Sequence, residues 1–295
     1  MSEASETAAL VALLRTGRRP WSLYAELVEQ WGSAVTVLEE ERARPDRGQG
    51  SLLSSDSATL IDSAAAEIAA WRAQGMELVT VLDPGYPENL RAVHDRPPLI
   101  FVAGRLQAAD AQSIAVIGAR SASPGAVRAA SVIAAHLVDH GYTVVSGLAA
   151  GIDTAAHTAA LARGGRTVAV IGTGLRHAYP PQNAALQRRL SAQCAVISQF
   201  WPDSAPSRRS FPMRNAVMSG VSLATVVVEA SERSGARTQA RLALAHGRPV
   251  LLLASLLAQP WARECAARPG AHVVRSAAEI TSLVERLTSP GALTA

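Results

Sequence analysis

The sequence contains no lysine, so all 28 of its basic residues are arginines. A phosphate-binding loop of the GxxxxGK[ST] type requires a lysine, and its absence argues against Walker-type ATPase chemistry. Any anion that this chain binds must therefore meet guanidinium groups, backbone N–H groups or helix N-termini. Arginine in place of lysine can also reflect a GC-rich genome, but the chemical consequence is the same.

Other absences narrow the class of protein. The two cysteines, Cys194 and Cys265, have no CxxC spacing, which argues against a disulfide framework or a zinc site. No apolar run reaches the ~18–20 residues that a membrane span needs. The N-terminal "MSEASETAAL" lacks the basic segment of a secretory signal. These features predict a cytoplasmic protein with neither metal nor cofactor and no membrane partner.

The composition is nevertheless that of a folded protein. Apolar residues make up 48% of the chain and are mostly Ala, Val and Leu, which suits packed α/β layers. Aromatic residues make up only 4%, so each one merits attention. The net charge of +4 leaves an excess of guanidinium groups for an acidic partner.

Residues 1–75 predict a small helical domain. Apolar side chains spaced by three and four form one stripe that fits a helical core better than a stacking platform: Trp21, Tyr24, Leu27 or Val28, and Trp31. A loop is expected at 43–55, and a second helix at 56–74 with Asp56 or Ser57 as its cap. Residues 76–112 predict connecting strands at 77–82 and 96–104, with a domain seam at 105–112.

Residues 113–295 change in character. Short runs of aliphatic residues alternate with segments of helical length, which predicts a mainly parallel sheet covered on both faces. We expect a doubly wound, Rossmann-like domain, in which ligands bind outside the carboxyl ends of the strands. The expected helices are at 124–140, 152–163, 182–192, 212–220, 235–246 and 276–287.

The turns after these strands carry glycine and open helices. They read "GARSASPG" (118–125), "SGLAAGID" (146–153), "GTGLRHAYPPQN" (172–183) and "EASERSG" (229–235). Arg120, Arg214, Arg233 and Arg237 are expected at the same edge of the sheet. Glycine is common in such turns without any ligand, and the first turn is not GxGxxG. Several such turns together, most beside an arginine, favour an anion-binding edge.

These motifs, with "FPMRNAVMSGVSLATVVVEASERSG" and "YPENL", resemble the DNA-processing protein A family (DprA, also called Smf). The resemblance runs in order along nearly the whole chain. It implies a protein without enzyme activity that binds single-stranded DNA, forms a homodimer and loads the RecA recombinase during DNA uptake in natural transformation. The chain is expected to lack the C-terminal winged-helix domain that many members have.

The resemblance also implies a binding site. In "FPMRN", Arg214 and Asn215 would contact a phosphate or a base edge, and Phe211 would stack on a base; the alternative is that Phe211 and Arg214 serve the core. Asp153 and His157 are interpreted as a helix N-cap and its partner rather than a catalytic pair. Glu229 would pair with a nearby arginine if it has no ligand. The predicted site comprises Gly118, Arg120, Ser146, Gly147, Gly151, Asp153, Arg209, Phe211, Arg214, Asn215, Ser234, Gly235 and Arg237.

Some positions depart from the family pattern. Gln199 stands where the family usually has an acidic residue, and Gln239 stands where it has a threonine. Ala216 stands in place of an arginine, whose role Arg237 could partly take over. Ser255 ends the run "LAS" that stands where the family usually has "VPG". Two alternatives therefore stay open. One is a nucleotide sensor or an enzyme like the nucleoside-monophosphate phosphoribohydrolases, whose "PGGxGT" turn is missing here. The other is a scaffold that has lost DNA binding.

Overall fold

The computed structural model describes residues 3–43 and 56–288. The chain forms two compact units. The first comprises the described residues up to Tyr86 together with Asp95–Ile100, and the second comprises Pro87–His94 and the chain from Phe101 onward. Residues 105–112 lie within the second unit. The predicted loop at 43–55 falls outside the described residues apart from its first residue.

The first unit is helical, as the apolar spacing predicts. Its elements are α1 (Glu3–Thr16), α2 (Trp21–Trp31), α3 (Ala34–Ala43), α4 (Ser57–Ala73) and β1 (Met76–Thr80). The carboxylate of Asp56 caps α4 by accepting from the N–H of Thr59 (2.7 Å), which confirms one of the two expected caps. Tyr24 and Val28 are fully buried, but Trp31 is 48% exposed. The expected stripe is therefore wrong at Trp31, because α2 ends there.

The second unit is an α/β domain. Its first elements are α5 (Glu88–Arg91), β2 (Leu99–Gly104, which begins in the first unit), η1 (Ala108–Ala111), β3 (Ser113–Ile117), α6 (Pro124–Asp139), β4 (Thr143–Ser146), α7 (Ile152–Ala162) and β5 (Thr167–Val170). They are followed by η2 (Pro181–Asn183), α8 (Ala184–Gln193), β6 (Ala195–Ser198), α9 (Ser210–Val221), β7 (Ala224–Val227), α10 (Gly235–Ala245), β8 (Val250–Leu253), η3 (Ala254–Ala258), α11 (Pro260–Ala266), β9 (Ala271–Val274) and α12 (Ala277–Thr288).

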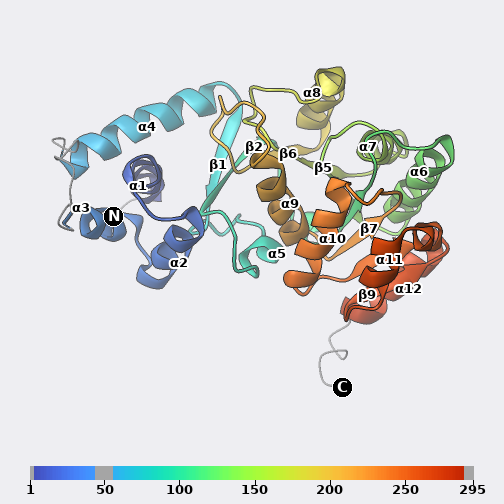
Figure 1. The fold of residues 1–295 in the computed structure, drawn as a ribbon. Helices are drawn as coiled ribbons and strands as arrows, with labels where there is room; N and C mark the ends of the chain where they lie inside the picture. Colours follow the sequence, from blue (N-terminus) through green and yellow to red (C-terminus); the bar gives the residue numbers. More distant parts are fainter. Residues whose placement is uncertain (1–2, 44–55, 289–295) are drawn as a thin grey trace. The chain divides into compact units, whose positions relative to one another are not determined.

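The strands of this unit lie in the order β2-β6-β5-β4-β3-β7-β8-β9. The pairings from β6 to β9 are parallel, and β2 runs antiparallel to β6. Helices α6, α7 and α12 pack on one face, and α9 and α10 pack on the other (Figure 1). The mainly parallel, doubly wound sheet confirms the expected fold.

The strand order reverses at β3. From β3 the chain moves outward to β4, β5 and β6, and then returns to place β7 on the other side of β3. At such a switch point the two connections leave in opposite directions and open a crevice above the carboxyl ends of the strands. The crevice of this chain is therefore expected above β3 and β7.

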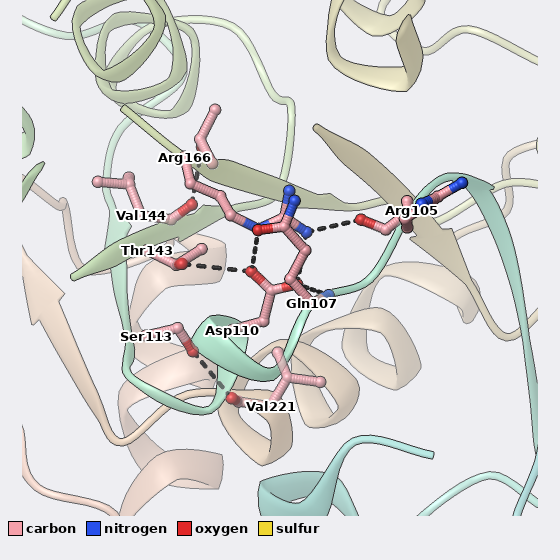
Figure 2. A network of polar contacts seen from close by, with 9 residues as sticks. Arg105, Gln107, Asp110, Ser113, Thr143, Val144, Arg166 and Val221 are labelled. Carbon is pink, nitrogen blue, oxygen red and sulfur yellow. Dashed lines mark hydrogen bonds and ion pairs between the residues drawn. The ribbon is translucent and has the colours of Figure 1, made fainter. Parts of the chain in front are cut away.

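The opposite, amino edge of the sheet is closed by a polar network (Figure 2). The guanidinium of Arg166 donates to the carboxylate of Asp110 (2.6 Å) and to the carbonyl of Arg105 (2.6 Å). Thr143, at the start of β4, also donates to Asp110 (3.2 Å). Because these groups satisfy one another, they stabilise the amino edge rather than form a site.

Among the described residues, no helix has the length and apolar character needed to cross a bilayer. Cys194 and Cys265 are both buried free thiols.

Candidate functional site

A cleft of about 700 Å³ opens above the carboxyl ends of β3 and β7, at the switch point. Three segments form most of its walls: the turn after β3, the first half of α9, and the turn between β7 and α10. Ala149 and Asp153, which follow β4, also line it. A smaller pocket of about 120 Å³ adjoins it and shares the side chains of Arg120, Phe211 and Arg214. We refer to the larger hollow as the cleft and to the smaller as the side pocket.

Helix N-termini face this edge of the sheet. Ser123 caps α6 by accepting from the N–H of Ala126 (3.2 Å), and Ser234 caps α10 by accepting from the N–H of Ala236 (3.2 Å). The remaining first-turn N–H groups and the helix dipoles give this edge a positive potential. These helices begin at this edge because each of them follows the carboxyl end of a short parallel strand after a single turn segment.

Arg214 lies at the base of the cleft and is buried. Its guanidinium donates to the carbonyl of Gly147, to that of Val170 (2.9 Å) and to the side-chain oxygen of Asn215 (3.0 Å). It thus ties α9 to the ends of β4 and β5. Burial lowers the pKa of Arg214, and the nearby charge of Arg120 adds to this, while Asp153 opposes it.

Asp153 closes the turn after β4. Its carboxylate accepts from the N–H groups of Gly147 (3.1 Å) and Ala149 (3.3 Å). Burial raises the pKa of Asp153, although the charge of Arg214 and these hydrogen bonds counteract the rise. The expected N-cap role is wrong, because the N-cap residue of α7 is Gly151 and Asp153 lies inside the first turn.

His157 is not the partner of Asp153. Its Nδ1 lies 2.7 Å from the hydroxyl of Thr167 on β5, in the core below the cleft. Burial lowers the pKa of His157 to about 3, so the ring stays neutral near neutral pH. Asp153 and His157 therefore act separately, each fixing the path of the chain around α7.

An exposed arginine and two aromatic rings line the mouth. The guanidinium carbon of Arg120 lies 5.0 Å from the ring centre of Phe211. The ring centres of Tyr179 and Phe211 are 5.5 Å apart. Phe211 belongs to the first turn of α9 and packs against Gly172, where a Cβ would come within 2.9 Å of the ring. Phe211 thus packs against the sheet and also borders the cleft, and its stacking on a base stays a prediction.

Close backbone contact explains two of the glycines. A Cβ at Gly118 would lie 2.6 Å from the side chain of Ile152 and 2.8 Å from the carbonyl of Glu229. Gly151 has a φ of +78°, and a Cβ there would lie 2.3 Å from the carbonyl of Ala119. These glycines bring the turns after β3, β4 and β7 together, whether or not a ligand is bound.

Glu229 places a carboxylate in the cleft wall, at the end of β7. It accepts from the N–H (2.9 Å) and the hydroxyl (2.6 Å) of Ser123. The expected pairing with an arginine is wrong, because Glu229 holds the start of α6 instead.

The structure brings most of the predicted site residues together. Eight line the cleft: Gly118, Arg120, Asp153, Phe211, Arg214, Asn215, Ser234 and Gly235. Gly147 lines the side pocket. Gly151 shapes the neighbouring turn, and Ser146 donates its hydroxyl to the carbonyl of Val116 (2.7 Å) within the sheet. Arg209 is exposed just before α9, and Arg237 lines a neighbouring groove, where it pairs with Glu232.

Sequence reasoning missed several lining residues. Tyr179 and Met218 line the two hollows, although both lie in motifs that the sequence analysis noted without assigning these two side chains a role. Gln239, noted only as a departure, is buried. With its amide oriented to satisfy both atoms, it donates to the carbonyl of Asn215 (2.8 Å) and accepts from the N–H of Ser219 (3.2 Å). This residue joins α10 to α9 beneath the cleft.

Comparison with known proteins places this geometry in a family. The chain is 38% identical over 174 residues to the DNA processing protein DprA of Streptococcus pneumoniae, which covers 59% of this chain and 61% of that protein. It is 39% identical over 181 residues to Protein Smf of Synechocystis, covering 60% of this chain and 46% of the relative. The chain thus matches between about half and two thirds of the length of these relatives.

Solved structures show the same fold. An X-ray structure of DNA processing protein A from S. pneumoniae superimposes with a TM-score of 0.75 and 27% identity, covering 94% of this chain and 97% of that one. A structure of the Helicobacter pylori protein, described for its single-stranded DNA binding mode, gives a TM-score of 0.63 and 23% identity over 71% of this chain and 96% of that one. The model of the family described as DNA recombination-mediator protein A matches residues 77–285. Because this match spans most of the sequence, the chain belongs to the DNA recombination-mediator protein A family.

Proposed function

We propose that the cleft binds single-stranded DNA. The observation that carries the proposal is the gathering of Arg120, Arg214 and the start of α10 around one cleft at the switch point of the sheet. Positive helix ends and guanidinium groups attract phosphates without regard to base sequence. The family description, which names a mediator of DNA recombination, supports the same ligand.

The aromatic pair at the mouth gives the preference for single strands. Phe211 is half-buried and Tyr179 is 40% exposed, so the pair offers aromatic surface beside the phosphate-binding edge. Unpaired bases can stack on such rings, and each stacked base contributes about 1–3 kcal/mol. Bases inside a duplex are already stacked and cannot reach the rings without being flipped out.

Membership of the family supports a proposal for the biological setting as well. We propose that the chain acts as a cytoplasmic homodimer, protects incoming single-stranded DNA and loads RecA onto it during DNA uptake or recombination. No catalytic step is part of this proposal. Glu229 and Asp153 are the carboxylates in the cleft wall, and both accept hydrogen bonds from nearby N–H groups, an arrangement that holds turns in place.

The test is a fluorescence-anisotropy titration of a labelled oligothymidylate at two salt concentrations, with duplex DNA and AMP as competitors. We expect binding that weakens steeply with salt, competition by unlabelled single strands, and poor competition by duplex or AMP. Strong competition by AMP, or release of adenine from it, would favour the nucleotide-binding alternative. Absence of binding at low salt, with RecA association retained, would favour the scaffold alternative.

A further inference from the structure

A second hollow of about 490 Å³ lies beside the cleft, against α10 and α11. It shares Arg233 and Ser234 with the cleft wall, so the two hollows adjoin at the start of α10. We call it the arginine groove, because Arg233, Arg237, Arg241 and Arg268 all line it.

The arginines of α10 follow one line. Arg237 and Arg241 are four residues apart in this helix and therefore lie on the same side, one turn after the other. Arg233 precedes them in the turn that borders the cleft. Arg268, which follows α11, contributes from the opposite wall. The guanidinium groups thus continue from the cleft along the outer side of α10.

The charge of this groove is only partly compensated. The carboxylates of Glu232 and Glu264 are in its lining, and Glu232 pairs with Arg237. Within the described residues, the side chains of Arg233, Arg241 and Arg268 form no ion pair. A set of exposed guanidinium groups without carboxylate partners favours an anionic ligand.

The groove offers charge but no exposed ring. Trp261 lies in its lining, yet it is only 2% exposed and donates its indole N–H to the carbonyl of Ala230 (3.3 Å). A base therefore has no aromatic face to stack on here. The chemistry fits the sugar–phosphate backbone of a polynucleotide better than its bases.

We propose that the arginine groove holds the backbone of the same single strand where it leaves the cleft. This inference rests on the proposed function. It predicts a binding site with two parts: a cleft that contacts a short stretch through phosphates and bases, and a groove that contacts only the phosphates of a longer strand. Affinity should therefore grow with strand length beyond what the cleft alone accounts for.

The double variant Arg241→Ala, Arg268→Ala tests this with oligothymidylates of about 4 to about 20 nucleotides, which spans the site sizes of single-strand binders. For the longest strand, we expect affinity to fall at least tenfold at low salt. The slope of log affinity against log salt should flatten by about 1.4, or 0.7 for each phosphate that an arginine no longer neutralises. For the shortest strand that binds, affinity should be unchanged.

The matched control is Arg275→Ala, Arg286→Ala, which removes two exposed arginines from the β9–α12 region instead. This variant should bind long and short strands as the unmodified chain does, apart from a small effect of net charge. If the groove variant behaves like the control while the unmodified chain binds DNA, the groove proposal is wrong and the cleft proposal stands. If the unmodified chain binds no single strand of any length, both are wrong.

Discussion

The guanidinium of Arg214 occupies the space where a side chain at Gly147 would lie. A Cβ built at Gly147 would come within 1.8 Å of Nη1 of Arg214, and that guanidinium also donates to the carbonyl of the same glycine. The absence of a side chain at Gly147 therefore makes room for the guanidinium of Arg214 rather than for a ligand. Through this contact, the "FPMRN" segment and the turn after β4 form one unit beneath the cleft.

Gly147→Ala should displace Arg214. Because the guanidinium is buried, we expect the free energy of unfolding to fall by about 1–3 kcal/mol, as in other overpacked interiors, and DNA affinity to fall with it. The matched control is Gly235→Ala, since a Cβ at that position meets nothing within 4 Å. Urea denaturation of both variants decides the point. If Gly147→Ala were as stable as Gly235→Ala, Arg214 would have adapted to the added methyl group without loss of stability.

Glu229→Gln should strengthen DNA binding. The substitution removes a negative charge from the cleft wall, while the amide can still hydrogen-bond to Ser123. We expect affinity for a single strand to rise about two- to tenfold at low salt, with a smaller gain at high salt. Weaker binding would mean that the start of α6 has moved. Hydrolysis of AMP by the unmodified chain, abolished in this variant, would assign Glu229 a catalytic role instead.

Phe211→Leu should separate stacking from packing. Leucine can still fill the space against Gly172 but offers no ring to a base. We expect a loss of about 1–3 kcal/mol in binding of a short oligonucleotide, with the salt slope unchanged. Tyr179→Leu is a companion test of the exposed ring. An unaltered affinity in both variants would remove the aromatic pair from the binding site.

His157 should make stability depend on pH. Its folded pKa of about 3 lies below the ordinary value of 6.5, so between these values the unfolded chain binds more protons. The contribution of His157 is therefore fully present above about pH 6.5 and is lost as the pH falls, by about 1.4 kcal/mol per pH unit.

The variant His157→Gln can keep a hydrogen bond to Thr167 without titrating. We therefore expect the stability advantage of the unmodified chain over this variant to shrink between pH 6.5 and 4, as measured by urea unfolding. A difference that does not change with pH would show that the ring is not buried in its neutral form.

The sequence indicated the fold and the edge of the sheet that carries the site, because aliphatic runs and glycine turns are local patterns. It did not reveal which polar groups serve the fold. The carbonyls that Arg214 contacts lie 67 and 44 residues away in the chain, and Ser123 lies 106 residues from Glu229. Such pairings depend on how the strands are ordered, which no short motif encodes.

Arg237 illustrates the same limit at the surface. Its sequence position suggested a replacement for the arginine missing at Ala216, yet it lies on the outer side of α10 in the arginine groove. Gln239, two residues on, points into the interior and joins α9 to α10. Neighbouring residues of one helix thus serve different purposes, and only the packing of that helix separates them.

The salt dependence of oligothymidylate binding by Arg120→Ala tests the central claim most directly. Arg120 is exposed at the mouth of the cleft, so its removal should leave the free energy of unfolding unchanged. We expect weaker binding and a log–log salt slope flatter by about 0.7, the value for one phosphate contact with a single strand. An affinity and slope equal to those of the unmodified chain, under conditions where that chain binds DNA, would show that the cleft is not where the strand is held.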